Sequence, residues 1–231
     1  SDGPEVTLRP FEDEQVRRYV MTFTRAYRRW ETGIPEDAEA EREAEQLLAA
    51  LGGSARLTAL ARNPFMLSAL ALINRAEGRL PRHRVQFYAI FARALCETWD
   101  SARRLVMSAL DPQRVLRFEE EAIPILGELA REMHERYPAG VAPADFVIST
   151  LASALVRRRG LAEEVARRSA VEFLERAGRE TQILLERGAD GWGFLHLTFQ
   201  EFFVAAGLHA SEEFEREAMA YLYDPRWEEI L

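Results

Sequence analysis

The stretch that decides the fold is GFLHLTFQEFFVAA, residues 193–206, where an apolar segment leads through His196 into a helix. Thr198 is followed three residues later by Glu201, which fits the capping box and predicts a helix that begins at Phe199. The predicted buried face of this helix consists of Phe199, Phe202, Phe203 and Ala206. His196 then lies just before free backbone N–H groups with partial positive charge, and this predicts a phosphate contact. The alternative is a structural histidine packed between two leucines.

A second informative stretch is ARNPFML, residues 61–67. Asn63 is a favourable helix cap, and Pro64 fits the first helical position, where its missing N–H is not needed. Gly78 is expected to end the helix that starts there. This pattern is common when taken alone, so it gains weight only together with the first stretch.

Both stretches resemble motifs of NACHT proteins, in the same order and spacing. Residues 194–203 are similar to the F-x-H-x-(S/T)-(F/L)-Q-E-(F/Y) motif that closes the winged-helix domain of this family. Residues 62–67 resemble the R-N-P-(L/F)-x-L segment of the small helical domain that follows the nucleotide-binding core. NACHT proteins belong to the STAND signalling NTPases, which include the animal NLR receptors and many bacterial relatives. The resemblance covers nearly the whole chain.

The resemblance implies a nucleotide site made of three residues of this chain. Pro64 would pack on the adenine, with Asn63 beside it, and His196 would contact the β-phosphate of ADP. The nucleotide, ADP or ATP with Mg²⁺, belongs to the full-length parent, and no cofactor is expected for this chain alone. The implied role is a nucleotide-sensing hinge that holds ADP in the closed state. Exchange for ATP would then allow homo-oligomerisation and effector activation, with a role in bacterial antiphage defence.

The expected fold is mainly α, a helical domain followed by a winged-helix domain with one β-hairpin. Residues 1–10 would end the nucleotide-binding core, with a last strand at residues 5–8. The small helical domain would cover residues 11–110 and the winged-helix domain residues 111–210, with Asp111-Pro112 as the boundary. Residues 211–231 would open a further helical domain. The expected partners are therefore the upstream core and downstream sensor repeats of the same protein.

Apolar periodicity and breaker residues predict the individual elements. The first domain should contain helices at about 13–30, 36–51, 54–61, 64–77 and 81–104. In the second, helices are expected at about 112–136, 143–158 and 161–177, with Pro124 kinking or restarting the first of them. A hairpin of residues 181–186 and 192–197 should precede the closing helix, and another helix should run through Tyr223.

Composition excludes several functions for the chain alone. All 30 basic residues other than histidine are arginine, so the chain has no P-loop lysine and no complete NTPase site. It is therefore not expected to be an enzyme alone, whereas its parent would be an ATPase. Absence of lysine beside abundant alanine and arginine is typical of a GC-rich, bacterial genome. No catalytic residue is assigned.

The formal charge of −8 argues against nucleic-acid binding. A winged-helix DNA-binding regulator remains an alternative, with residues 161–177 in the major groove, although Glu163 and Glu164 would repel phosphates. A structural helical adaptor is the third possibility.

Metal and membrane sites are not expected either. The four histidines form no metal-binding motif, and Cys96 fits a core thiol among apolar helical neighbours. No apolar run reaches the roughly 20 residues that a membrane span needs, and the first residues do not form a signal peptide. The expected location is the cytoplasm.

Overall fold

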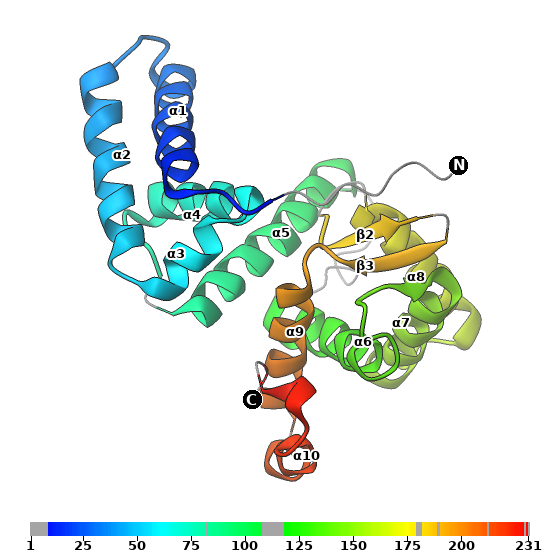
Figure 1. Cartoon of the computed structure of the whole chain (residues 1–231). Helices are drawn as coiled ribbons and strands as arrows, with labels where there is room; N and C mark the ends of the chain where they lie inside the picture. Colours follow the sequence, from blue (N-terminus) through cyan, green and yellow to red (C-terminus); the bar gives the residue numbers. More distant parts are fainter. Residues whose placement is uncertain are drawn as a thin grey trace. The chain divides into compact units, whose positions relative to one another are not determined.

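A computed structural model describes residues 9–81, 83–107, 118–178, 182–188, 190–211, 213–228 and 230. The described chain is mainly helical, with one small antiparallel sheet of three strands (Figure 1). The predicted fold class is confirmed at this level. The chain divides into two compact units, residues 1–91 and 92–231. The division falls within a helix, whereas the predicted boundary at Asp111-Pro112 and the predicted strand at residues 5–8 lie outside the described residues.

The first unit is helical throughout its described part. Its elements are α1 (Asp13–Thr32), α2 (Asp37–Gly52), α3 (Ala55–Ala61), α4 (Pro64–Glu77) and the first part of α5 (Arg84–Met107). The first four follow the predicted ranges within two residues at each end, and α5 begins three residues after the predicted start. The core of this unit includes the buried side chains of Val20 in α1, Leu47 in α2, and Leu67 and Leu70 in α4.

Local capping signals explain the helix boundaries in the first unit. Ser54 caps α3, where its hydroxyl oxygen accepts a hydrogen bond from the Leu57 N–H at 3.4 Å. The Asn63 Oδ1 accepts from the N–H groups of Phe65 (2.9 Å) and Met66 (3.2 Å), and Pro64 opens α4. Gly78 ends α4 with a left-handed φ of 70°. The predicted roles of Asn63, Pro64 and Gly78 are confirmed, whereas the Ser54 cap was not predicted.

The second unit combines helices with the sheet. Its elements are a π-helix (Phe118–Ala122), α6 (Ile123–Arg136), β1 (Ala142–Pro143), α7 (Ala144–Arg159), α8 (Glu163–Arg176), β2 (Leu184–Arg187), β3 (Gly191–Phe194), α9 (Leu197–His209), α10 (Phe214–Tyr221) and a 3₁₀ turn (Pro225–Trp227). Pro124 lies in the first turn of α6, directly after the π-helix. The proline was predicted either to kink or to restart this helix, and the structure shows that it restarts the helix.

The sheet has β3 at its centre, antiparallel to β1 on one side and to β2 on the other. The hairpin of β2 and β3 confirms the prediction, although both strands are shorter than predicted, and the two-residue β1 was not predicted. Gly191 and Gly193 allow the close approach of neighbouring chain segments. A Cβ at Gly191 would lie 2.5 Å from the Arg187 carbonyl oxygen, and one at Gly193 would lie 2.5 Å from the Gly140 carbonyl oxygen.

Helices α6 and α9 form the main helix pair of the second unit. They cross at Gly127 and Gly207, where a Cβ at Gly127 would lie 2.8 Å from the Gly207 Cα. Phe199 and Phe203 of α9 are fully buried, as predicted for this face. The α6–α9 pair therefore fixes the helix whose first residue follows His196.

The segment after α9 also packs on α6. The Tyr221 hydroxyl donates to the Glu135 carboxylate at 2.6 Å, and its ring stacks on Trp227 at 3.7 Å between centroids. Burial, with the Glu135 hydrogen bond as the second cause, raises the pKa of Tyr221 to about 12. The helix predicted up to Tyr223 is shorter in the structure, since α10 ends at Tyr221.

Candidate anion site at His196

His196 connects the hairpin to α9 and is itself the N-cap of that helix. Its backbone is extended (φ −149°, ψ 152°), and its ring Nδ1 accepts a hydrogen bond from the Thr198 N–H at 3.3 Å. Nδ1 also lies 3.0 Å from the Thr198 hydroxyl oxygen. The predicted cap at Thr198 with a helix start at Phe199 is therefore wrong, because the histidine ring caps the helix two residues earlier.

This cap changes the expectation of a row of free N–H groups after His196. The Thr198 N–H bonds to the ring, and the Phe199 N–H bonds to the His196 carbonyl oxygen at 2.9 Å. The Gln200 N–H reaches the same carbonyl oxygen at 3.4 Å. The prediction of free N–H groups is therefore wrong for these three residues. The extended backbone of His196 places its ring and its carbonyl oxygen where they accept these hydrogen bonds. An anion at this site would have to rely mainly on side chains.

The hydrogen bonds of His196 define its tautomer. Because Nδ1 accepts from a backbone N–H, it holds a lone pair, and the proton of the neutral ring is on Nε2. Burial, followed by the positive charge of Arg187, lowers the pKa of His196, so the neutral ring is favoured at pH 7. Nε2 makes no hydrogen bond to any residue that the structure describes. The half-buried ring therefore offers one directed Nε2–H donor.

Arg187, the last residue of β2, is the charged neighbour that sequence reasoning missed. Its Nη2 donates to the carbonyl oxygens of Leu195 (3.0 Å) and Phe194 (3.4 Å), directly before His196. The Arg187 side chain runs past Gly193, where an added Cβ would lie 3.6 Å from the Arg187 Cγ. The sequence placed Arg187 in a turn. Only the hairpin register, with Gly193 leaving room on β3, could have indicated its direction.

Gln200 is a second residue whose environment the sequence did not reveal. Its side chain is 1% exposed, and neither amide atom has a hydrogen-bond partner in the described part of the chain. It lies in the first turn of α9, close enough to the α6–β1 loop that a Cβ at Gly140 would come within 3.7 Å of its Oε1. Buried amides without partners are uncommon in folded proteins.

The three predicted nucleotide-contact residues fall in different units. Asn63 and Pro64 adjoin at the start of α4 in the first unit, both partly exposed, and His196 precedes α9 in the second. The side-chain oxygen of Asn63, Oδ1, caps α4. Its role in the structure is thus to hold the first turn of α4, with Pro64 presented at that turn.

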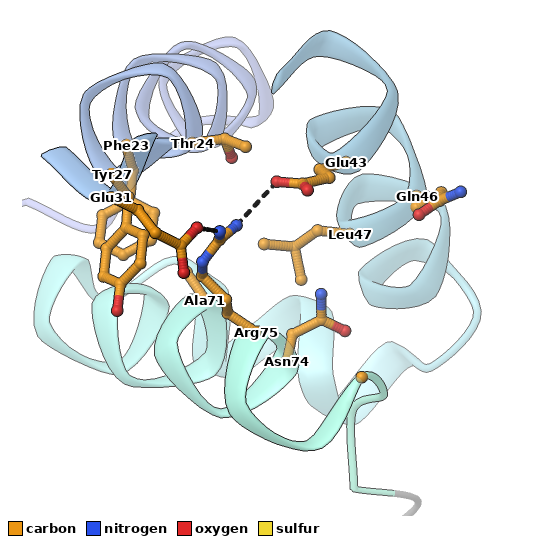
Figure 2. Close-up of a pocket in the computed structure, with 11 residues that line it drawn as sticks. Phe23, Thr24, Tyr27, Glu31, Glu43, Gln46, Leu47, Ala71, Asn74 and Arg75 are labelled. Carbon is orange, nitrogen blue, oxygen red and sulfur yellow. Dashed lines mark hydrogen bonds and ion pairs between the residues drawn. The ribbon is translucent and has the colours of Figure 1, made fainter. Parts of the chain in front are cut away.

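The first unit also contains a cavity that the sequence did not predict. It lies among α1, α2 and α4, has a volume of about 330 Å³, and is shown in Figure 2. Its lining residues are Phe23, Thr24, Tyr27, Glu31, Glu43, Gln46, Leu47, Ala71, Asn74, Arg75 and Gly78. Arg75 pairs with Glu31 and with Glu43 (2.8 Å), and its guanidinium lies 4.6 Å from the centre of the Tyr27 ring. The charges of Arg75, Glu31 and Glu43 are therefore balanced by ion pairs within the cavity lining.

The part of the chain that the structure describes contains neither a metal-binding cluster nor a membrane-spanning helix. Among the described residues, no three or more His, Cys, Asp or Glu side chains gather in a way that could hold a metal ion. None of the helices in the described ranges combines the length and apolar character needed to cross a membrane. Comparisons with protein-family models, curated proteins and solved structures give no significant match.

Proposed function

We propose that this chain is the nucleotide-sensing hinge of a NACHT-type STAND NTPase, with a helical domain followed by a winged-helix domain. The observation that carries the proposal is the neutral His196 ring, whose Nδ1 is used by the helix cap and whose Nε2–H is available. Such a donor suits a phosphate oxygen. It does not require the histidine to gain a charge when the ligand binds.

In the closed state, the Nε2–H of His196 donates to the β-phosphate of ADP held by the upstream nucleotide-binding core. Pro64 packs on the adenine, and Asn63 keeps the first turn of α4 in place. Exchange for ATP loosens the His196 contact, and the winged-helix domain moves away. The nucleotide shifts this equilibrium only by the difference between its contacts in the two states.

The P-loop and Mg²⁺ chemistry belong to the core, so the chain alone does not hydrolyse ATP. In the parent, release of the closed state allows homo-oligomerisation and effector activation, with sensor repeats following this region. We place the protein in the bacterial cytoplasm, in antiphage defence. These assignments rest on the motif resemblance together with the His196 geometry.

The element order supports a winged-helix domain, which the DNA-binding alternative shares, and the surface of α8 argues against that alternative. Helices α6, α7 and α8 precede the β2–β3 hairpin, and β1 adds to the same sheet. In a DNA-binding domain of this type, α8 would enter the major groove, yet its first turn carries the exposed acidic residues Glu163 and Glu164. The structural-adaptor alternative predicts no response of His196 to phosphate.

ADP release from the parent protein tests the proposal. The H196N variant keeps a strong helix cap but lacks the ring and its Nε2–H. Loss of one hydrogen bond of about 1 to 3 kcal/mol should speed ADP dissociation roughly five- to 150-fold and raise signalling without a trigger. The matched control is H209N, which removes the exposed histidine at the other end of α9. Unchanged ADP release from a folded H196N protein would overturn the proposal.

A further inference from the structure

We propose that Arg187 is a second anion-binding residue of the His196 site and contacts the same diphosphate. This inference rests on the proposed function, since His196 must face the phosphates for Arg187 to reach them. The positive charge of the site then comes from Arg187 of β2, which lies outside the motif that contains His196.

The position of Arg187 is fixed by hydrogen bonds to the backbone. Nη2 donates to the carbonyl oxygens of Leu195 and Phe194, the two residues before His196. The room at Gly193 lets the side chain reach them from the neighbouring strand. Because Nη2 is anchored in this way, the other N–H groups of the guanidinium remain for a ligand.

No acidic side chain in the described part of the chain pairs with Arg187. Many arginines of the second unit form ion pairs, such as Arg159 with Glu121 and Arg131 with Glu217. Within the described residues Arg187 forms none, including with Glu186 and Asp190 of the same hairpin. Its side chain is exposed, so an anion can approach it. Its hydrogen bonds to the carbonyl oxygens of the two residues before His196 place it next to that residue, and its positive charge is one cause of the lowered pKa of His196.

A neutral histidine and a cationic arginine complement each other at a diphosphate. The histidine supplies a directed donor without net charge, and the guanidinium supplies charge with several donors in one plane. Since the first N–H groups of α9 are used by the cap, Arg187 is the source of positive charge that the site needs. Arg187 therefore contributes the salt-sensitive part of the affinity.

Pyrophosphate titration of the 231-residue chain, followed through the His196 ring signals by NMR at low salt, tests the inference. We expect saturable shifts for the unaltered chain. R187Q, which keeps a polar side chain without the charge, should weaken the apparent affinity about fivefold, as for an exposed charge-assisted contact. R187K, which keeps the charge without the planar fork, should fall between them. The matched control R168Q removes an exposed, unpaired arginine of α8 and should leave the affinity unchanged.

The outcomes separate the two proposals. Equal affinity of R187Q and the unaltered chain overturns the role of Arg187 and leaves that of His196 standing. H196N lacks the observed ring, so its pyrophosphate affinity is measured by calorimetry beside that of the unaltered chain. If H196N binds as tightly as the unaltered chain while R187Q binds weakly, the phosphate contact of His196 is overturned and the role of Arg187 is supported. Absence of any His196 shift in the unaltered chain overturns the inferred anion site of Arg187 and His196 on this chain, whereas the proposed function is decided separately by ADP release from the parent. A loss with R168Q equal to that with R187Q also overturns the inference, because net charge alone would explain it.

Discussion

The helix pairs α1–α2 and α6–α9 are held together in opposite ways. Between α1 and α2, arginines of α1 form ion pairs with carboxylates of α2. These carboxylates lie at the start of α2 and farther along it. Arg28 alone pairs with Glu36, Glu39 and Glu43. The hydrogen bond from Arg28, together with the positive charge of Arg28, lowers the pKa of the Glu36 carboxyl. Between α6 and α9, by contrast, two glycines let the helix backbones approach directly.

The two helix contacts differ in how they respond to salt and to small displacements of the helices. Ion pairs near the surface weaken with salt and tolerate adjustment of long side chains. A close backbone approach has no such freedom, because protein interiors are packed near crystal density. The α6–α9 pair is therefore the firmer support, and it is the one that positions His196 and its ring.

A Cβ at the α6–α9 crossing should have the largest effect on stability. In G127V the new side chain would meet the Gly207 Cα and the Phe203 carbonyl oxygen, both within 2.9 Å of the Cβ position. Since both neighbours are backbone, the helices must separate, and we expect a loss of about 3 kcal/mol in the free energy of unfolding. Urea unfolding followed by circular dichroism measures it.

Gly52 provides the matched glycine control. It lies at the end of α2, where an added Cβ meets nothing within 4 Å. G52A should be neutral or slightly stabilising, because alanine is the better helix former. A G127V protein as stable as G52A would show that α6 and α9 do not depend on their close approach.

Removing the central arginine of the α1–α2 ladder should have a smaller effect that depends on salt. R28M leaves Glu36, Glu39 and Glu43 without their shared partner, so the three carboxylates repel one another. We expect a lower urea midpoint at low salt and a smaller difference in 1 M NaCl, where the Debye length is about 3 Å. G127V should show no comparable salt dependence.

Arg56 of α3 is the control for R28M, because it is exposed and has no ion pair within the described residues. R56M should leave the urea midpoint nearly unchanged at both salt concentrations. If R28M and R56M give equal midpoints at low salt, the ladder does not stabilise the α1–α2 pair.

The capping role of the His196 ring can be tested with a pair of variants. H196A removes the cap of α9 and should lower the free energy of unfolding by about 1 kcal/mol. H196N restores a capping oxygen and should recover most of that loss. Thermal unfolding of both variants checks this, and equal stability of H196A and the unaltered chain would mean that the Nδ1 hydrogen bond is not a stabilising cap.

The sequence predicted what depends on local signals. Asn63, Pro64 and Gly78 act within one helix, so their capping roles could be inferred from spacing alone. The start of α9 could not, since the usual capping residue Thr198 competes with a histidine whose extended backbone brings Nδ1 to the helix start.

Features that join distant segments were also missed. The direction of Arg187 depends on hairpin register and on Gly193, and the cavity around Arg75 depends on three helices meeting. Neither follows from residue spacing within one element. The same limit explains β1, whose two residues pair with β3 only because the preceding loop brings them to the sheet.

The smallest expected effect is the pH dependence that His196 gives to the second unit. Its pKa is lowered in the folded chain from an ordinary value of 6.5, first by burial and then by Arg187. Below pH 6.5 the unfolded chain therefore binds a proton that the folded chain resists, and unfolding becomes easier as the pH falls toward the folded-state pKa. The contribution is fully present above pH 6.5. Urea midpoints at pH 7.5, 6.5 and 5.5 should fall more steeply for the unaltered chain than for H196N, which retains every other histidine. Parallel curves for the two proteins would mean that protonation of His196 is not linked to folding, and the neutral Nε2–H donor would lose its support.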